Sequence, residues 1–326
     1  MAGTATGTLS DEYQALLEGC GLLDRSERGK LALSGADAVE FLNGQVTNEL
    51  ADLAPGEGRY AAFLTHKGKM LGDLRVLAVP GAGGEGPELL LDTERTALQA
   101  LFDMIRRFKV GYRVELHKRT VESGLLSLIG PRAAVLVATE LGPAEHANAP
   151  ARIEGVEALA IRTDLGIDLL CAAKDTEALS GALRARGATP VGVPAAECIR
   201  VESGRPRYGL DLDDSVIPQE AGLNERAVSF TKGCYVGQET VARLHYKGKP
   251  NRRLRGLALS APAIPGAQLQ LGERVVGQLG TVVDSPRHGP IALALVRREA
   301  EPGMRVAVGD AEITAEVIEL PFADAG

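Results

Sequence analysis

The pattern of the sequence changes near residue 250, and this change constrains the fold more than any other feature. After it, apolar segments such as "RGLALS", "IALALV" and "EITAEVIEL" alternate with Gly, Pro and Asp. Turn residues at such short intervals are typical of a small antiparallel barrel. We therefore predict a C-terminal β-barrel over residues 248–326, joined to the rest of the chain through the basic stretch "KGKPNRRLRG".

The sequence before residue 250 mixes strand and helix patterns. The segments at 75–79 and 87–92 read as strands, and "ALAIRTDLGIDLLCA" reads as a hairpin that turns at Asp164-Leu165-Gly166. These elements lack the regular βαβ rhythm of a doubly wound sheet, which favours an α+β architecture. A chain of 326 residues is also too long for one typical core, so we expect several domains.

Helix caps and apolar faces predict three helices in this part of the chain. Ser34-Gly-Ala-Asp37 resembles a capping box, and the helix that it opens ends near Asn43-Gly44. Asp92 is predicted to cap a second helix, whose apolar face runs over 97–108. A third helix is predicted over 175–186, because Gly187 follows it.

Composition limits the class of protein. The net charge of −7 argues against a general nucleic-acid surface, so we expect no direct nucleic-acid partner. No apolar run reaches the ~20 residues of a membrane span. The first 24 residues contain no Lys or Arg, unlike a signal or transit peptide, and we expect a cytoplasmic protein with no membrane partner.

The four cysteines are scattered along the chain, with no C-x-x-C pair and no Cys/His ligand spacing. We therefore predict neither a disulfide nor a metal site. The sequence also lacks a Walker A motif, a G-x-G-x-x-G after a strand, a G-x-S-x-G and an H-E-x-x-H. These absences disfavour the usual ATPases, Rossmann oxidoreductases, serine hydrolases and zinc proteases.

Glu202 is a candidate site residue because its predicted position does not suit a carboxylate. Pro194 fits the first position of a helix over 194–203. Glu202 then lies on the apolar side of this helix and at the negative end of its dipole, so it needs a partner. The partner could be Arg205 or Arg207 in a salt bridge, or a ligand with paired N–H donors such as a pterin or guanine ring.

Cys234 is the second candidate, in the crowded stretch "TKGCYVGQE" at 231–239. Lys232 lies two residues before it, and Gly237 precedes a possible helix start at Gln238. A thiol beside a cation and near a helix N-terminus has a lowered pKa and is more reactive. The alternative is a turn with a buried, inert cysteine, and local spacing does not decide between the two.

Two further features leave alternatives open. His245 could act as the base of Cys234 in a Cys–His hydrolase, although nothing local fixes that geometry. The junction before the barrel is either a solvated linker or a binding surface for a polyanionic tail, through five cations: Lys247, Lys249, Arg252, Arg253 and Arg255.

At this point the residues resemble a known family. "KGCYVGQE" resembles the signature of the YgfZ family of folate-binding proteins, which are relatives of the glycine-cleavage T-protein, an aminomethyltransferase. "FLNGQVTNEL", "GRYAAFLTHKGKMLGDLRV", "RVESGRPRYGLDLDDSVIPQEAGL" and "SPRHGPIALALVRRE" are similar to family segments in the same order. The resemblance therefore covers most of the chain.

The resemblance implies an α+β fold of three domains in a ring, with tetrahydrofolate in the centre. Two interleaved α+β domains would precede the C-terminal β-barrel. The limits that we expect are 1–50 with 120–200 for the first domain, 51–119 with 201–247 for the second, and 248–326 for the barrel. We also expect a monomer.

The resemblance also implies site residues. Glu202 matches the glutamate of an R-x-E-x-G segment that binds the pterin, with Arg200 and Arg205 beside it. Cys234 matches the signature cysteine, and with Lys232 it would form the catalytic pair. The signature residues expected to contact the folate are Tyr235, Gly237 and Gln238.

Three functions remain in competition. The resemblance implies a folate-binding accessory protein that supports iron–sulfur cluster assembly or repair in client enzymes, including radical-SAM enzymes that modify tRNA. The alternative is a folate-dependent aminomethyltransferase or demethylase. However, the Lys-Asp pair that carries the catalytic aspartate of aminomethyltransferases is missing from "LLLDTERTALQA". A third possibility is a binding module without chemistry, which would dock a partner on the barrel and the basic junction.

Overall fold

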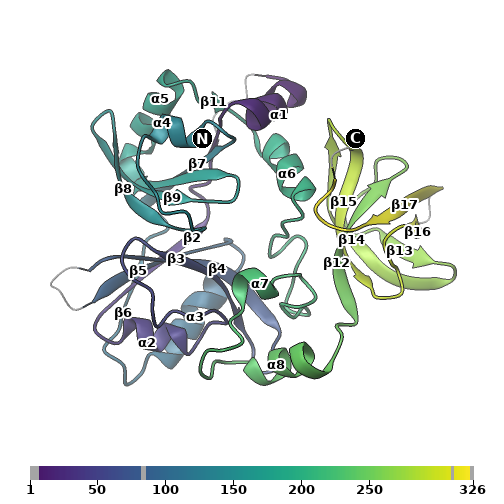
Figure 1. Ribbon diagram of the computed structural model, residues 1–326, viewed down its shortest axis with the longest axis horizontal. Helices are drawn as coiled ribbons and strands as arrows, with labels where there is room; N and C mark the ends of the chain where they lie inside the picture. The colour runs from purple at the N-terminus through teal and green to yellow at the C-terminus, as the bar shows by residue number, and fades with distance from the viewer. Residues whose placement is uncertain (1–6, 82–85, 310–311, 324–326) are drawn as a thin grey trace.

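The computed structural model describes residues 7–81, 86–309 and 312–323. Figure 1 shows three parts arranged around a centre: two α+β domains on one side and a β-barrel on the other. This arrangement confirms the predicted α+β fold with a C-terminal barrel in a three-domain ring. No helix in the described ranges is both long enough and apolar enough to span a bilayer.

The first domain is built on a six-stranded sheet in the order β11-β1-β7-β10-β9-β8. Its strands are β1 (Gly21–Asp24), β7 (Ser123–Ile129), β8 (Asn148–Ile153), β9 (Val156–Arg162), β10 (Gly166–Ala172) and β11 (Thr189–Pro190). Its helices are α4 (Ala133–Val137), the 3-10 turn η2 (Ala173–Asp175) and α5 (Thr176–Ala185). Leu179 and Leu183 of α5 are fully buried against the sheet, and the helix itself confirms the one predicted over 175–186.

The second domain is built on a five-stranded antiparallel sheet in the order β3-β4-β5-β2-β6. Its strands are β2 (Gly29–Ser34), β3 (Gly58–Leu64), β4 (Met70–Pro80), β5 (Pro87–Thr93) and β6 (Glu115–Lys118). Two helices, α2 (Ala38–Asn43) and α3 (Leu98–Phe108), complete this domain. Their apolar faces share one core with the sheet, where Phe41, Leu101 and Ile105 are almost fully buried.

The chain leaves the first sheet and enters the second at an earlier residue than the predicted domain boundary at residue 50. Strand β2 and helix α2 lie in the second domain, whereas the predicted limits assign residues 1–50 to the first. The reason is that β2 pairs with β5 and β6, both of which follow much later in the sequence. Such long-range pairing leaves no signal in the residues around position 50.

The third domain is a closed six-stranded barrel in the order β12-β15-β14-β13-β16-β17, closed by pairing of β12 with β17. Its strands are β12 (Arg252–Leu259), β13 (Gln268–Leu271), β14 (Arg274–Ser285), β15 (Gly289–Arg297), β16 (Arg305–Val308) and β17 (Ile313–Ile318). Closure leaves no free sheet edge, and small residues such as Ala292 and Ala294 fill the interior beside Leu257 and Val317.

Helices outside the sheets connect the three domains: α1 (Leu9–Glu18), α6 (Val193–Glu202), α7 (Asn224–Ala227) and α8 (Gln238–Lys247). Helix α6 packs on α1 through Cys198 and Ile199, while Val201 on another face meets barrel residues Leu254 and Leu293. Figure 1 shows α6 between the first domain and the barrel, and α7 and α8 between the second domain and the barrel. These helices hold the ring together.

Both predicted N-terminal caps differ from the structure. Asp92 lies within β5, where its buried carboxylate pairs with Arg28 and Arg75, so the prediction that it caps α3 was wrong. Helix α3 begins at Leu98 without a side-chain cap. Ser34, which would begin the predicted capping box, is the last residue of β2, and Asp37 directly precedes α2 with a carboxylate that accepts hydrogen bonds from Arg113 rather than from the first turn of the helix.

Candidate functional site

A cavity of about 180 Å³ lies where the two α+β domains meet the segments that follow α6 and precede α7. Because its walls come from stretches that are far apart in the sequence, only the assembled fold creates it. The residues that line it are Arg25, Arg28, Tyr60, Asp73, Arg75, Glu94, Ser127, Ile129, Glu145, His146, Thr163, Asp164, Leu165, Asp168, Arg200, Arg205, Pro206, Arg207 and Arg226.

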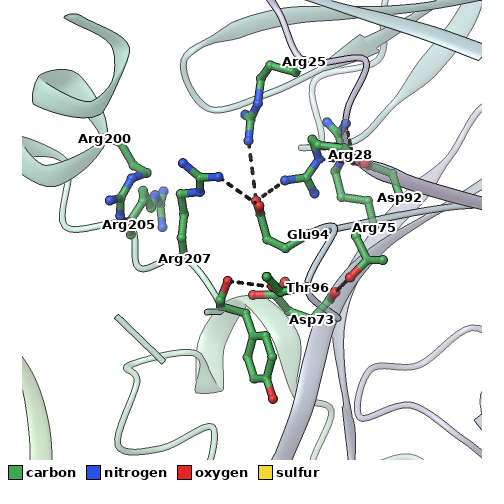
Figure 2. Close-up of polar contacts among 12 residues, drawn as sticks. Arg25, Arg28, Asp73, Arg75, Asp92, Glu94, Thr96, Arg200, Arg205 and Arg207 are labelled. Carbon is green, nitrogen blue, oxygen red and sulfur yellow. Dashed lines mark hydrogen bonds and ion pairs between the residues drawn. The ribbon is translucent and has the colours of Figure 1, made fainter. Parts of the chain in front are cut away.

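Three arginines converge on one carboxylate at this cavity. Figure 2 shows Arg25, Arg28 and Arg207 directed at Glu94, which follows β5. Arg207 lies 3.1 Å from Glu94 through Nη2 and 3.1 Å from Glu197 through Nη1. Burial alone would raise the pKa of Glu94, but the surrounding guanidinium groups hold it below its usual value. The carboxylate is therefore a fixed negative charge.

Arg75 joins the sheets of the two α+β domains at the base of the same cavity. It lies directly opposite Asp92 in the β4–β5 pairing, and its Nη2 is 2.5 Å from Asp92 Oδ2. Its Nη1 reaches Asp168 of β10, also at 2.5 Å. Burial would raise the pKa of Asp92, but Arg28 and Arg75 lower it well below its usual range. The negative charges of Asp92 and Asp168 are thus balanced by arginine side chains.

Tyr60 and Asp73 form a polar pair of a different kind. Asp73 lies opposite Ala62 in the β3–β4 pairing, so Tyr60, two residues from Ala62, is its diagonal neighbour on the same face. The Tyr60 hydroxyl donates a hydrogen bond to Asp73 Oδ2 at 2.7 Å, and the Arg226 guanidinium lies 5.1 Å from the Tyr60 ring. Burial raises the pKa of Asp73 to about 6, although the Tyr60 hydrogen bond opposes this shift.

Several buried polar atoms at the cavity have no hydrogen-bond partner among the described residues, although His146 Nε2 lies 3.6 Å from Glu145 Oε1. They are both ring nitrogens of His146, the hydroxyl of Ser127 and Nε of Arg207. Burial, and after it the charges of Arg75 and Arg226, lowers the pKa of His146 to about 3, so its imidazole is neutral. A neutral imidazole offers one donor and one acceptor. Because unpaired buried polar groups are costly, this set is suited to a polar ligand or ordered water.

A larger cavity of about 870 Å³ also reaches Arg75 and Asp92, between the faces of the two sheets. Its apolar walls include Leu90, Leu159 and Leu170. None of the unpaired polar atoms noted above belongs to its lining. The smaller cavity therefore holds the groups that could carry chemistry.

Glu202 has partners within the chain, but they are not the ones that its sequence position suggested. Its Oε2 accepts a hydrogen bond from the Tyr13 hydroxyl of α1 at 2.9 Å, and its Oε1 accepts one from Ser285 of β14 at 2.5 Å. All three side chains are buried. Glu202 thus connects α1, α6 and the barrel, and its burial needs no ligand.

The two arginines weighed as salt-bridge partners of Glu202 pair elsewhere, so that prediction was wrong. Arg205 Nε donates to Asp164 at 2.6 Å, and Arg207 contacts Glu94 and Glu197. Arg205 nevertheless lines the cavity, as does Arg200, the other arginine predicted from this segment. Arg200 is held by Asp211 and Glu197, at 2.8 and 2.7 Å.

Lys232 is buried and its ammonium group is surrounded by oxygen atoms. Nζ donates to the backbone carbonyls of Asn43, Val46 and Asn48 at 2.7, 2.9 and 2.6 Å, and to Asn43 Oδ1 at 2.9 Å. Burial lowers its pKa to about 8. These contacts direct the cation into the loop after α2, so its place in the structure is that of an anchor for the segment that carries Cys234.

Cys234 is exposed, so it is not the buried turn cysteine that the sequence left open as an alternative. Its neighbour Tyr235 is buried in a core cluster with Val216 and Val241, and burial raises its pKa to about 12. Gly237 precedes α8 with φ of +85°, and a Cβ there would lie 2.6 Å from the Thr65 carbonyl oxygen. The thiol therefore sits on a turn that is fixed on both sides.

The residues predicted from "TKGCYVGQE" do not line the cavity, and neither does Glu202. Helix α8 begins at Gln238, as predicted. The groups that sequence reasoning missed are Tyr60, Asp73 and His146. Asp73 could have been noticed, because an aspartate in the middle of the apolar strand "MLGDLRVLAV" needs a partner as much as Glu202 does.

Comparison with known proteins adds three findings. A family model described as the GCVT N-terminal domain matches residues 3–232. An aminomethyltransferase of Geobacillus kaustophilus is 30% identical over 97% of this chain and 90% of its own length. An aminomethyltransferase of Streptomyces coelicolor is 29% identical over the same shares of the two chains.

Among solved structures, the glycine cleavage system aminomethyltransferase T from Bartonella henselae is similar in fold. The TM-score is 0.85 with 23% sequence identity, over 99% of this chain and 94% of that one. The likeness extends over all three domains.

Proposed function

Because the chain belongs to the family of the GCVT N-terminal domain, we propose that it binds tetrahydrofolate in the 180 Å³ cavity and transfers a one-carbon group, as an aminomethyltransferase-like protein. The observation that carries this proposal is the set of unpaired polar atoms at a cavity that also contains a carboxyl group able to gain and lose a proton.

The residues at the cavity fit the polar ring of a folate. A reduced pterin offers ring N–H groups, an amino group and a carbonyl oxygen. Ser127 and the neutral His146 can each donate and accept, and Arg207 Nε can donate. The cavity itself has room for a ring system, while the rest of the molecule would extend along the surface.

The chain's own residues would bind, orient and protect the ligand. Ser127 and His146 would pair with the ring, and Arg200 and Arg205 remain proposed contacts because they line the cavity. The arginine–carboxylate pairs around Glu94 keep the walls rigid. When bound, tetrahydrofolate supplies the nitrogen atoms that accept the one-carbon unit.

Calorimetric titration with tetrahydrofolate tests the binding site. We expect binding by the wild type and a loss of affinity of about tenfold or more in Ser127→Ala and His146→Leu, because each loses a polar partner of the ligand. Glu177→Gln, a change of an exposed residue on α5, is the control. No binding by the wild type, or unchanged affinity in both cavity variants, would contradict the proposed site.

The same titration on Glu202→Gln tests the folate contact predicted for Glu202 from the sequence. The amide oxygen can still accept the hydrogen bond from Ser285, and the amide NH2 can donate to the Tyr13 hydroxyl oxygen, so the helix contact is largely preserved. If Glu202 contacts the folate, the affinity of this variant for tetrahydrofolate should be lower than that of the wild type.

Transfer activity needs a separate assay. Tetrahydrofolate and an aminomethyl donor are supplied, and formation of methylene-tetrahydrofolate is measured. Turnover by the wild type is expected, and its persistence in Cys234→Ala would favour the transferase over a thiol-dependent function.

One observation favours a second function, support of iron–sulfur cluster assembly or repair as in the YgfZ family. Cys234, which matches the signature cysteine of that family, is the exposed one of the four cysteines. In this reading Lys232 fixes the turn that presents the thiol. We expect Cys234→Ala to fold and to bind tetrahydrofolate, but to abolish support of iron–sulfur enzymes in cells. Normal iron–sulfur enzyme activity with this variant would exclude the second function.

A further inference from the structure

We propose that the mouth of the β-barrel binds a small ligand through two or three linked phosphate groups. The mouth is a pocket of about 380 Å³ between the junction that enters β12 and the end of β15. It shares no lining residue with the 180 Å³ cavity, so this inference goes beyond the proposed function. The charged residues that line the mouth are Lys249, Arg253, Arg255, Arg297, Arg298 and Glu301.

The alternation of side chains along β12 places arginines at the end of the barrel interior. Leu257 belongs to the barrel core, and every second residue of a strand lies on the same face. Arg253 and Arg255 therefore continue the inward face beyond the apolar core. The strand pairing agrees, because Arg253 lies opposite Val296, which is buried in that core. The pocket thus has an apolar floor, which includes Val296 and Ala300, and a cationic rim.

Most cations at the mouth have no counter-charge from the protein. Arg255 pairs with Glu319 at 2.6 Å. Glu299 is close enough for two of the arginines to lower its pKa, but its own ion pair is with Arg274 at 3.0 Å. Among the residues that the structure describes, no ion pair involves the remaining four cations: Lys249, Arg253, Arg297 and Arg298. A cleft lined by one sign of charge concentrates ions of the other sign.

The amount of charge favours phosphate groups. Five cations against the one carboxylate of Glu301 leave an excess of four positive charges in the lining. A phosphate group carries about −1.5 to −2 at pH 7, so two or three linked phosphates balance this excess. Guanidinium groups also form paired hydrogen bonds with phosphate oxygens. Carboxylates carry one charge each and are spaced several bonds apart, so fewer of them fit into this pocket.

The lining also argues against a nucleic acid as the ligand. None of the described residues that form the pocket is aromatic, so nucleobases have no surface on which to stack. The recognised group is therefore the phosphate chain and not a base.

The structure separates the cations of the basic junction into two groups. Arg252 is held by Glu220 at 2.9 Å, and Lys247 ends α8 outside the lining of the mouth. Arg297 and Arg298 join the mouth instead, from the end of β15. The Arg298 backbone N–H donates to the carbonyl of residue 251 at 2.9 Å, which fixes the two sides of the pocket to each other.

Calorimetric titration of the full chain with inorganic tripolyphosphate tests this site. We expect Arg253→Gln and Arg298→Gln each to bind about tenfold more weakly than the wild type, because each loses a charge-assisted hydrogen bond to phosphate. Arg305→Gln is the matched control: this exposed arginine of β16 lies outside the lining, and its loss changes the net charge equally. Its affinity should be that of the wild type. Glu301→Gln should bind more tightly, because it removes a negative charge beside the ligand.

Urea unfolding provides a second measurement. The two rim arginines are exposed, so their replacement should leave the unfolding midpoint unchanged in the absence of ligand. Tripolyphosphate should raise the midpoint of the wild type and raise that of Arg253→Gln less, since a ligand stabilises the state that binds it.

Three results would overturn the proposal. The first is no binding of tripolyphosphate by the wild type. The second is an equal loss of affinity in Arg305→Gln, which would show attraction by overall charge alone. The third is tighter binding of tri-γ-glutamate or of a short single-stranded oligonucleotide than of tripolyphosphate. Titration of the same variants with tetrahydrofolate keeps the two proposals apart, because we expect folate affinity to be unaffected by changes at the mouth.

Discussion

Arg75 on β4 lies 2.5 Å from Asp168 on β10, and this buried ion pair ties the sheet of the second domain to the sheet of the first. The exposed fractions of the two side chains are 10% and 7%. We expect Asp168→Asn to lower the free energy of unfolding by about 3 kcal/mol, because a buried guanidinium loses one of its two counter-charges. Urea unfolding measures this change. Glu177→Gln, whose ion pair is exposed, should change it by less than about 0.5 kcal/mol.

Asp73 should make the stability of the protein depend on pH in a defined direction. Its pKa is about 6 in the folded chain, above the usual 3.8, so between these values the folded state binds more protons than the unfolded state. The contribution of Asp73 to stability is therefore full below about pH 4 and is lost as the pH rises through about 6.

Asp73→Asn removes this titration. Relative to the variant, we expect the wild type to lose roughly 2–3 kcal/mol of unfolding free energy between pH 4 and pH 7. Urea unfolding of both proteins at several pH values gives the difference. A difference that does not change with pH would show that Asp73 titrates normally.

We expect Lys232 to stabilise the folded structure of the segments around it, and not to act as a free cation. Lys232→Met would leave the oxygens of Asn43, Val46 and Asn48 without their donor, and we expect a loss of about 3 kcal/mol. Lys67→Met, on the exposed loop after β3, is the control and should be nearly neutral. Equal unfolding curves for the two variants would refute the anchoring role.

Replacing Gly237 by alanine should destabilise the protein more than the same replacement at another glycine with a positive φ. Gly237→Ala would bring a Cβ within 2.6 Å of the Thr65 carbonyl oxygen at φ of +85°. Gly222→Ala would meet nothing within 4 Å at φ of +71°, so it carries the conformational cost alone. We expect about 1 kcal/mol of destabilisation for Gly222→Ala and clearly more for Gly237→Ala, measured by thermal unfolding.

The four thiols should differ in reactivity. Cys20, Cys171 and Cys198 are buried, and burial raises the pKa of each, whereas Cys234 is exposed. Brief treatment of the folded protein with iodoacetamide should modify Cys234 alone, and mass spectrometry of peptides identifies the site. Denatured protein, in which all four react, is the control. Modification of a buried thiol at a similar rate would contradict this ordering.

Local signals predicted much of the fold. The barrel, the hairpin that turns at Asp164-Leu165-Gly166 and helices α2, α5 and α6 all follow from turn residues or from apolar spacing within a short window. The position of β2 does not, because its partners β5 and β6 lie far along the chain. The expected domain boundary at residue 50 reflects this missing information.

The candidate site was less accessible to sequence reasoning, for a similar reason. The closeness of Lys232 and Cys234 in sequence suggested a cation beside a thiol, but contacts with residues 43–48 direct the lysine elsewhere. Glu202 was correctly seen to need a partner, yet its partners are Tyr13, near the start of the chain, and Ser285 in the barrel. The Tyr60–Asp73 pair depends on strand register, which sequence alone does not give. The cytoplasmic location and the monomeric state stay predictions.

The early departure of the chain from the first sheet has a consequence for synthesis on the ribosome. Strand β1 pairs with β7 and β11, which both follow residue 122 in the chain. Every strand of the second sheet, in contrast, lies within residues 29–118. The ribosome has therefore synthesised all strands of the second sheet before either strand that pairs with β1 has been made. The N-terminal segment is made first and becomes stable later, when the emerging β7 reaches it.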